Sequence, residues 1–200
     1  VSFDQPLQFG GLVEVNFSNS NTLLSLPENI FNDSKNLVTV VLPPNLQSIE
    51  KSAFFRCIKL ESITIPYKVF LIDEFAFSEC SSLRDITFFK PEIGTPDESV
   101  LIINEGAFKL TSIKDIEFPS RLTEIKKDIC AQCTNLETVD FSETKVITFG
   151  IGILTGAVNL TKIIFPSHES VEIDDIFKLT CPTHGLLEMH FYKPPSKMFK

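Results

Sequence analysis

The 200-residue sequence contains no tryptophan, two tyrosines and only eight glycines, against 19 phenylalanines. It has no apolar run near the roughly 18 residues that a membrane-spanning helix needs, so we expect no membrane insertion by this segment. It begins at Val1 without the charged, apolar and small regions of a signal peptide. Neither end carries a polar capping repeat, and we therefore expect a segment of a longer protein.

Basic residues are also in the minority, with 18 Lys and Arg against 26 Asp and Glu and a formal net charge of −8. Nucleic acid is excluded as a partner, because its phosphates require a basic face. Adsorption to anionic membranes is disfavoured for the same reason. A hydrophobic content of 43% with 22% charged residues is typical of a folded chain rather than a disordered one.

Catalytic motifs are missing as well. The sequence has neither a Gly-x-Ser-x-Gly nucleophile motif nor a phosphate-binding P-loop. Its three histidines, His168, His184 and His190, have no cysteine, serine or carboxylate at a recognisable catalytic spacing. We therefore expect no enzymatic activity, no catalytic residues and no cofactor.

The most frequent pattern is a six-residue phrase: a leucine-like residue, two variable positions, a branched aliphatic residue, one variable position and a large apolar residue. Successive copies are 25, 23, 23, 30, 23, 24 and 26 residues apart, and they begin at Leu12, Leu37, Leu60, Leu83, Ile113, Leu136, Leu160 and Leu186. A period in the twenties with this phrase is typical of a leucine-rich-repeat solenoid.

Alternation within the phrase points Ile63 and Ile65 inward and Ser62 and Thr64 outward, as a strand with one covered face requires. We predict a β-rich α/β fold: one right-handed solenoid of seven or eight repeats over residues 1–200. A parallel sheet would form its concave side, with short strands and brief helical turns on the convex side.

Stacked repeats align equal positions into columns. The position six residues before a new repeat holds a phenylalanine or another apolar residue, namely Phe31, Phe54, Phe77, Cys130 and Leu154. Phe108 lies one residue out of step, in an Ala-Phe pair that we expect to serve the same column. This column predicts a structural spine of phenylalanine rings, which bury a large area without a polar group to satisfy.

The better-preserved repeats combine Leu-x-x-Ile-x-Ile-Pro with a second Leu-x-x-Ile stretch and Ala-Phe-x-x-Cys. Over residues 12–191 this combination resembles the BspA-like class of leucine-rich repeats. The resemblance implies a surface or secreted protein that attaches to host or neighbouring-cell proteins. The sequence departs from that class at Glu50 and Asp73, which we take to replace the glycine before the Ala-Phe segment, and in the irregular unit from Leu160 to Gly185.

Cysteines recur with the repeat, because Cys57, Cys80 and Cys133 each lie three residues before the next copy. We predict buried structural thiols that act as small apolar residues. The alternative is a zinc site, since Cys-x-x-Cys and Cys-x-x-His are zinc half-sites. The two pairs are Cys130 with Cys133 and Cys181 with His184. We expect no metal, because the pairs would lie two repeats apart, roughly 10 Å, which is too far for four ligands to meet at one ion.

The outward strand positions form two polar columns on the expected concave face. Their middle carries an acidic patch of Asp85, Asp115, Glu117 and Asp140. With Thr87 and Thr138, these are our candidate partner-binding residues. A protein partner with a basic surface would relieve the repulsion between the carboxylates. The alternative is a solvated face whose charge prevents self-association.

The long interval after Leu83 contains a candidate loop over residues 89–100, rich in proline and acidic residues. Loops on a rigid scaffold often carry recognition, although inert insertions are equally common.

We therefore predict a non-enzymatic protein–protein interaction module for cell-surface adhesion or ligand binding. The alternative is a structural scaffold in the cytoplasm. Asn16, Asn32 and Asn159 match the N-glycosylation pattern, and a glycan on Asn32 or Asn159 would exclude the second location.

Overall fold

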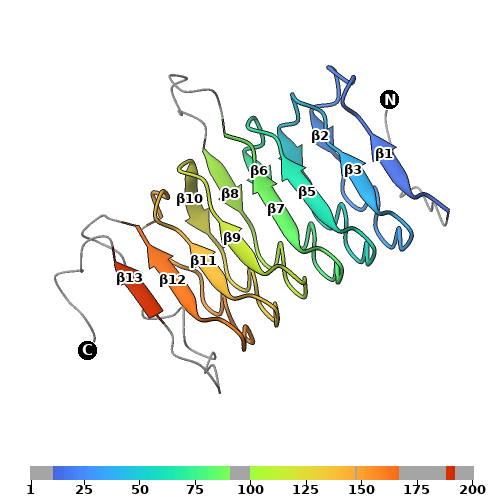
Figure 1. Ribbon diagram of the computed structural model, residues 1–200. Helices are drawn as coiled ribbons and strands as arrows, with labels where there is room; N and C mark the ends of the chain where they lie inside the picture. Colours follow the sequence, from blue (N-terminus) through green and yellow to red (C-terminus); the bar gives the residue numbers. More distant parts are fainter. Residues whose placement is uncertain (1–10, 91–99, 147, 167–187, 192–200) are drawn as a thin grey trace.

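The structure is a computed structural model that describes residues 11–90, 100–146, 148–166 and 188–191 (Figure 1). The chain coils so that each turn places one strand in a front layer and, in most turns, a second short strand in a back sheet. The front layer consists of β1 (Glu14–Asn16), β3 (Thr39–Val41), β5 (Ser62–Ile65), β7 (Asp85–Phe88), β9 (Asp115–Glu117), β11 (Thr138–Asp140), β12 (Lys162–Phe165) and β13 (Glu188–Phe191). The back sheet consists of β2 (Ser25–Leu26), β4 (Ser48–Ile49), β6 (Leu71–Ile72), β8 (Leu101–Ile103) and β10 (Leu122–Ile125).

The paired strands are parallel and in the register that the repeat predicts. Glu14 lies beside Thr39, and Ser62 lies beside Asp85, so equal positions of successive repeats are neighbours. Burial alternates along the strands as expected: in β5, Ile63 and Ile65 are buried while Ser62 and Thr64 are exposed. The predicted parallel solenoid is confirmed for the described residues.

The front layer is not one continuous ladder. Its strands form three groups, β1–β3, β5–β7 and β9–β11–β12–β13. Among the described residues no ladder pairing joins β3 to β5 or β7 to β9, although each pair is in contact. We call these two interruptions the first seam (β3/β5) and the second seam (β7/β9).

Prolines lie at both seams. Pro66 follows β5 and Pro119 follows β9, and neither has an N–H to donate to the preceding strand. After β7 the equal position is Phe89, whose N–H donates to the Ile65 carbonyl at 2.9 Å. Proline alone does not open a seam, because Pro43 and Pro166 follow strands that pair normally.

The brief helical turns that we expected are absent from the described residues, which contain no helix. The corresponding segments are tight turns, closed for example by the Cys57 N–H donating to the Phe54 carbonyl at 3.1 Å. Ser52 and Arg56, with φ of 54° and 60°, explain this difference. A helix requires consecutive negative φ values, and these left-handed residues recur four apart in successive repeats. The α component of the expected class is thus not found here, and the handedness of the coil stays a prediction.

The glycine position of the repeat also differs from our expectation. Gly106, at φ 61°, directly precedes Ala107. The equal residues in the two preceding repeats are Ser52 and Phe75, both left-handed, rather than Glu50 and Asp73. The strained position is therefore two residues closer to the alanine than we inferred.

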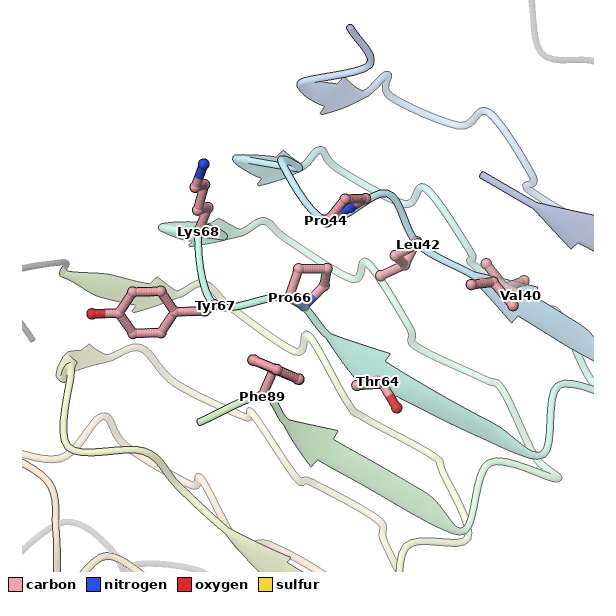
Figure 2. Close-up of a pocket in the computed structure, with 9 residues that line it drawn as sticks. Val40, Leu42, Pro44, Thr64, Pro66, Tyr67, Lys68 and Phe89 are labelled. Carbon is pink, nitrogen blue, oxygen red and sulfur yellow. The ribbon is translucent and has the colours of Figure 1, made fainter. Parts of the chain in front are cut away.

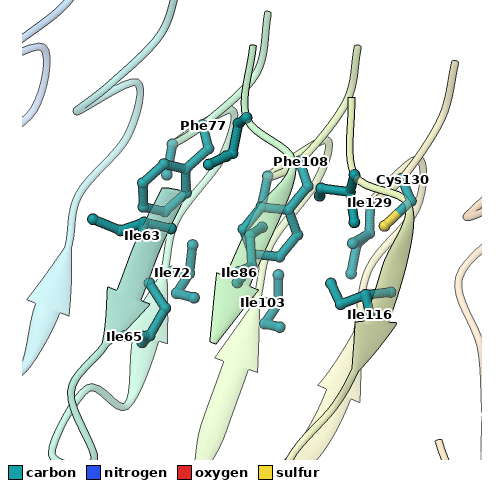
Figure 3. Packing of buried hydrophobic residues seen from close by; sticks show 14 of the residues in the cluster. Ile63, Ile65, Ile72, Phe77, Ile86, Ile103, Phe108, Ile116, Ile129 and Cys130 are labelled. Carbon is teal, nitrogen blue, oxygen red and sulfur yellow. The ribbon is translucent and has the colours of Figure 1, made fainter. Parts of the chain in front are cut away.

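The predicted phenylalanine spine is confirmed. Ring centroids are 5.3 Å apart from Phe31 to Phe54, 5.1 Å from Phe54 to Phe77 and 5.7 Å from Phe77 to Phe108. Figure 3 shows Phe77 and Phe108 in succession, with Cys130 continuing the column. Phe108 serves this column, as expected from its Ala-Phe pair.

A second ring column, which we did not predict, runs through the last position of the six-residue phrase and includes one ring, Phe149, that is bridged to the back sheet. It joins Phe88 to Phe118 at 6.0 Å and Phe118 to Phe141 at 5.0 Å, and it continues through Phe149 to Phe165. This second column provides aromatic packing in the carboxyl-terminal repeats, where Cys130 and Leu154 take the place of phenylalanine in the first column.

Among the residues that the structure describes, one charged side chain lies within the core. Arg121 is 1% exposed, and its guanidinium donates to the carbonyls of Val69 and, at 3.3 Å, Pro66. It also lies over the Tyr67 ring, 5.5 Å from the centroid. Arg121 therefore joins the turn after β9 to the turn after β5, past the repeat that contains β7.

We expect Phe77→Ala to lower the free energy of unfolding by about 3–5 kcal/mol, because it leaves a cavity between two stacked rings. Phe70→Ala is the matched control, since Phe70 lies beside β6 and is 47% exposed. Urea unfolding followed by circular dichroism measures both. Equal losses in the two variants would contradict the spine's structural role.

Gly106→Ala should also destabilise the fold, by about 1–3 kcal/mol, because φ is positive there. A Cβ at this position would lie 2.6 Å from the Phe75 ring. Gly11→Ala is the control, because a Cβ there meets nothing within 4 Å. Comparable midpoints for the two variants in thermal unfolding would refute this assignment of the strained position.

Candidate functional site

The six candidate residues lie on the outer side of three neighbouring front strands. Asp85 and Thr87 belong to β7, Asp115 and Glu117 to β9, and Thr138 and Asp140 to β11. Within the ladder, Thr138 lies beside Asp115, and Asp140 lies beside Glu117. All are exposed except Thr138 and Asp140, which are half-buried. The structure therefore brings the six residues together.

A cation that sequence reasoning missed lies within this group. The Lys90 Nζ is 2.6 Å from Oε1 of Glu117. The hydrogen bond to Glu117 and the charge of its carboxylate raise the pKa of Lys90 above its ordinary value, and Glu143 and Asp140 add to the effect. Glu117 is thus already paired within the chain.

Asp140 also has a partner. Its carboxylate accepts the Ser142 N–H at 2.7 Å, as the Asn16 side chain accepts the Ser18 N–H at 2.9 Å in the first repeat. This contact gives Asp140 a role in the turn after β11. Asp85 and Asp115 differ, because their carboxylates make no hydrogen bond or ion pair with any described residue.

An apolar pocket of about 370 Å³ lies at the first seam (Figure 2). Thr64 and Lys68 form its polar border, and its apolar lining includes Val41, Leu42, Pro44, Pro66, Tyr67 and Phe89. A second hollow of about 360 Å³ lies at the second seam, between Thr87 and Phe89 on one side and Glu117 and Pro119 on the other. Phe89 contributes to both and is 56% exposed.

Sequence reasoning did not find these pockets. The available signal was Phe89 itself, a large apolar residue at a position where other repeats have Pro43, Pro66 or Pro119. The candidate loop begins here, but residues 91–99 lie outside the described part of the chain. Its flanking residues Phe89, Lys90 and Val100 are exposed.

The cysteine column is buried and hydrogen-bonded. The thiols of Cys57, Cys80 and Cys133 donate to the carbonyls of the phenylalanines at 31, 54 and 108, each at 3.1 Å. All three are free and buried, as is Cys130, which confirms the prediction of structural thiols. Burial, together with the hydrogen bond to Cys57, raises the pKa of Cys80 well above its ordinary value.

For the zinc alternative, the structure describes only half of the proposed ligands. Cys130 and Cys133 lie in the core, where the hydrogen bond to Cys133 and burial raise the pKa of Cys130 well above its ordinary value. Cys181 and His184 lie outside the described residues. Within the described ranges no three histidine, cysteine or acidic side chains are grouped as metal ligands.

The family described as BspA type leucine-rich repeat region matches residues 9–95 and 91–181, in six copies. The chain belongs to this family. BspA-type repeats are leucine-rich repeats, which generally mediate protein binding and are typically non-enzymatic. Within the described ranges, no helix has the length and apolar character needed to cross a membrane.

Two solved structures are similar to this BspA-type array. One is the pneumococcal vaccine antigen PcpA, with a TM-score of 0.57, 17% identity, and coverage of 93% of this chain and 53% of that one. The other is the leucine-rich repeat protein TpLRR of T. pallidum, with a TM-score of 0.54, 26% identity, and coverage of 78% and 75%. This chain therefore spans about half the length of the pneumococcal antigen. No curated protein matches it significantly.

We expect Cys57, Cys80, Cys130 and Cys133 to resist iodoacetamide in the native protein at mildly alkaline pH and to react fully in urea. Burial blocks the reagent, and a raised pKa leaves little thiolate at Cys80 and Cys130. Peptide mass spectrometry measures each site, with and without a chelator. Native labelling of Cys130 and Cys133 that appears only with the chelator would instead support the zinc alternative.

Proposed function

We propose that this chain is a non-enzymatic module that binds a protein partner with a basic surface on its front layer. The observation that carries the proposal is the pair Asp85 and Asp115, whose carboxylates are exposed, lie on adjacent strands and have no partner among the described residues. A cation from another protein would relieve their mutual repulsion and steer association. Thr87 and Thr138 would supply hydroxyls beside them. A right-handed coil with the front layer on its concave side is part of the same proposal.

The location that we propose is the cell surface or the medium outside the cell. The family match supports a protein-interaction repeat, and one solved structure with this fold is that of a pneumococcal vaccine antigen. Adhesion is the form of binding that we favour for such a location.

An intracellular scaffold is the second candidate, and the four free buried thiols favour it, because disulfides are common in oxidising compartments. Glycosylation in the native source distinguishes the two. Asn159 is the more informative acceptor, because its side chain is exposed, although its amide donates to the Thr134 carbonyl at 2.8 Å. Asn32 is half-buried and donates to Asn29 Oδ1 at 3.0 Å, so a glycan there would disturb the fold.

We expect the double variant Asp85→Asn/Asp115→Asn to weaken partner binding about tenfold or more, with a reduced dependence on salt. These substitutions leave the Lys90–Glu117 pair and the Asp140 turn intact. Quantitative affinity capture from host and source-organism lysates identifies the partner, and titration of that purified partner measures the affinity.

The control for this experiment is Glu28→Gln/Asp33→Asn, which removes two exposed acidic charges elsewhere on the chain. Equal affinities for the wild type, the front-layer variant and the control would show that the acidic face only keeps the sheet solvated. A captured partner without basic surface residues would also contradict a binding role for the acidic face.

A further inference from the structure

We propose that the apolar pocket at the first seam is the anchor site for the partner. It would accept an aromatic or large aliphatic side chain from an extended protein segment. The same segment would carry a lysine or arginine two to four residues away, whose side chain reaches Asp85 and Asp115. This inference rests on the proposed function and names the chemistry of the segment that binds.

The pocket has the properties of an anchor site. Single exposed apolar residues are ordinary on a protein surface. Here Val41 and Phe89, 36% and 56% exposed, border a cavity of about 370 Å³ together with Pro44, Pro66 and Tyr67. Interface energy concentrates where an aromatic or aliphatic side chain fills such a pocket.

The walls of the pocket are fixed before any partner arrives. Pro44 and Pro66 have restricted φ values, which limits the movement of the turns after β3 and β5. Buried Arg121 donates to the Pro66 carbonyl and holds the Tyr67 ring, so the core positions one wall. A preformed pocket costs little ordering entropy on binding.

The distance to the free carboxylates sets the spacing in the partner. From Phe89, which borders the pocket on its β7 side, back to Asp85 is four residues along the strand, or about 13 Å. An extended segment covers that length with about four residues, at about 3.3–3.6 Å each. The length of a lysine or arginine side chain shortens the requirement, which gives the range of two to four.

Charge also selects the occupant. Three cations beside this face are already paired within the chain, which leaves Asp85 and Asp115 for a partner's cation; the pairs are Arg84–Glu61, Lys90–Glu117 and Lys114–Glu137. A second copy of this chain is disfavoured, because a net charge of −8 repels like copies at an acidic face.

The test starts from a display library of random dodecapeptides selected against the whole 200-residue chain. We expect enriched peptides to share an aromatic or large aliphatic residue with a lysine or arginine two to four positions away. Because the chain contains no tryptophan, a selected peptide with tryptophan as its anchor reports its own environment. Its fluorescence should shift to the blue as the indole enters the pocket.

Variants then assign the binding energy of that peptide. Phe89→Ser and Val41→Ser should each weaken it about tenfold or more and reduce the blue shift. Phe70→Ser is the matched control, because Phe70 is also an exposed phenylalanine but lies beside the back sheet. Asp85→Asn/Asp115→Asn should weaken the peptide while leaving the blue shift at saturation unchanged. Circular dichroism confirms that each variant is folded.

Several outcomes would overturn the inference. They are a selection that enriches no peptide, peptides whose affinity is equal for wild type and Phe89→Ser, and a dimer in sedimentation that Phe89→Ser dissolves. If binding depends on Asp85 and Asp115 but not on Phe89 or Val41, the proposed function stands and only the pocket assignment fails. Binding that depends on Phe89 and not on the carboxylates would refute the mixed apolar and basic segment.

Discussion

Main-chain hydrogen bonds that recur at the same place in successive repeats hold the rest of this structure in place. The N–H groups of Phe31, Phe54 and Phe77 donate to the carbonyls of Ala53, Ala76 and Ala107, each at 2.8 Å. Because every such bond joins one repeat to the next at the same position, side chains stack in columns at the spacing of parallel strands. The phenylalanine columns, the thiols bonded to carbonyls and the outward polar columns all follow from this register.

The same constraint shows why the seams matter for function. A continuous ladder presents a regular surface on which every position repeats. Where β3 meets β5 and β7 meets β9, the strands are in contact but no ladder pairing joins them. The chain uses these places for features that no regular repeat can provide, namely an apolar pocket and the exposed Phe89 at its border. The proposed binding surface thus combines carboxylates at positions that recur in every repeat with an apolar pocket that lies at a seam.

Sequence reasoning succeeded where a feature recurs and failed where it occurs once. The front strands, the first ring column and the cysteine column follow from a period of about 23 residues, because alternation and spacing fix which side chains point inward. The glycine position of the repeat was misplaced because Ser52 and Phe75 occupy a conformation that glycine usually marks. Arg121 follows Pro119 and Ser120 in what reads as a surface turn, and only tertiary packing shows that its guanidinium is buried. The seams depend on pairing between strands, which no single-strand pattern contains.

The two ring columns overlap in the middle of the array. The first ends with Phe108, while the second begins with Phe88, so the repeat that contains β7 has a ring of each column. Arg121 spans the same region from the turn after β9 to the turn after β5. Under a pulling force along the solenoid axis, the front layer has no ladder at the seams, but the back-sheet ladder continues from β2 to β10 across both of them. Arg121 adds a link across the second seam. At the seams, the back sheet rather than the front layer would therefore keep neighbouring repeats together under tension.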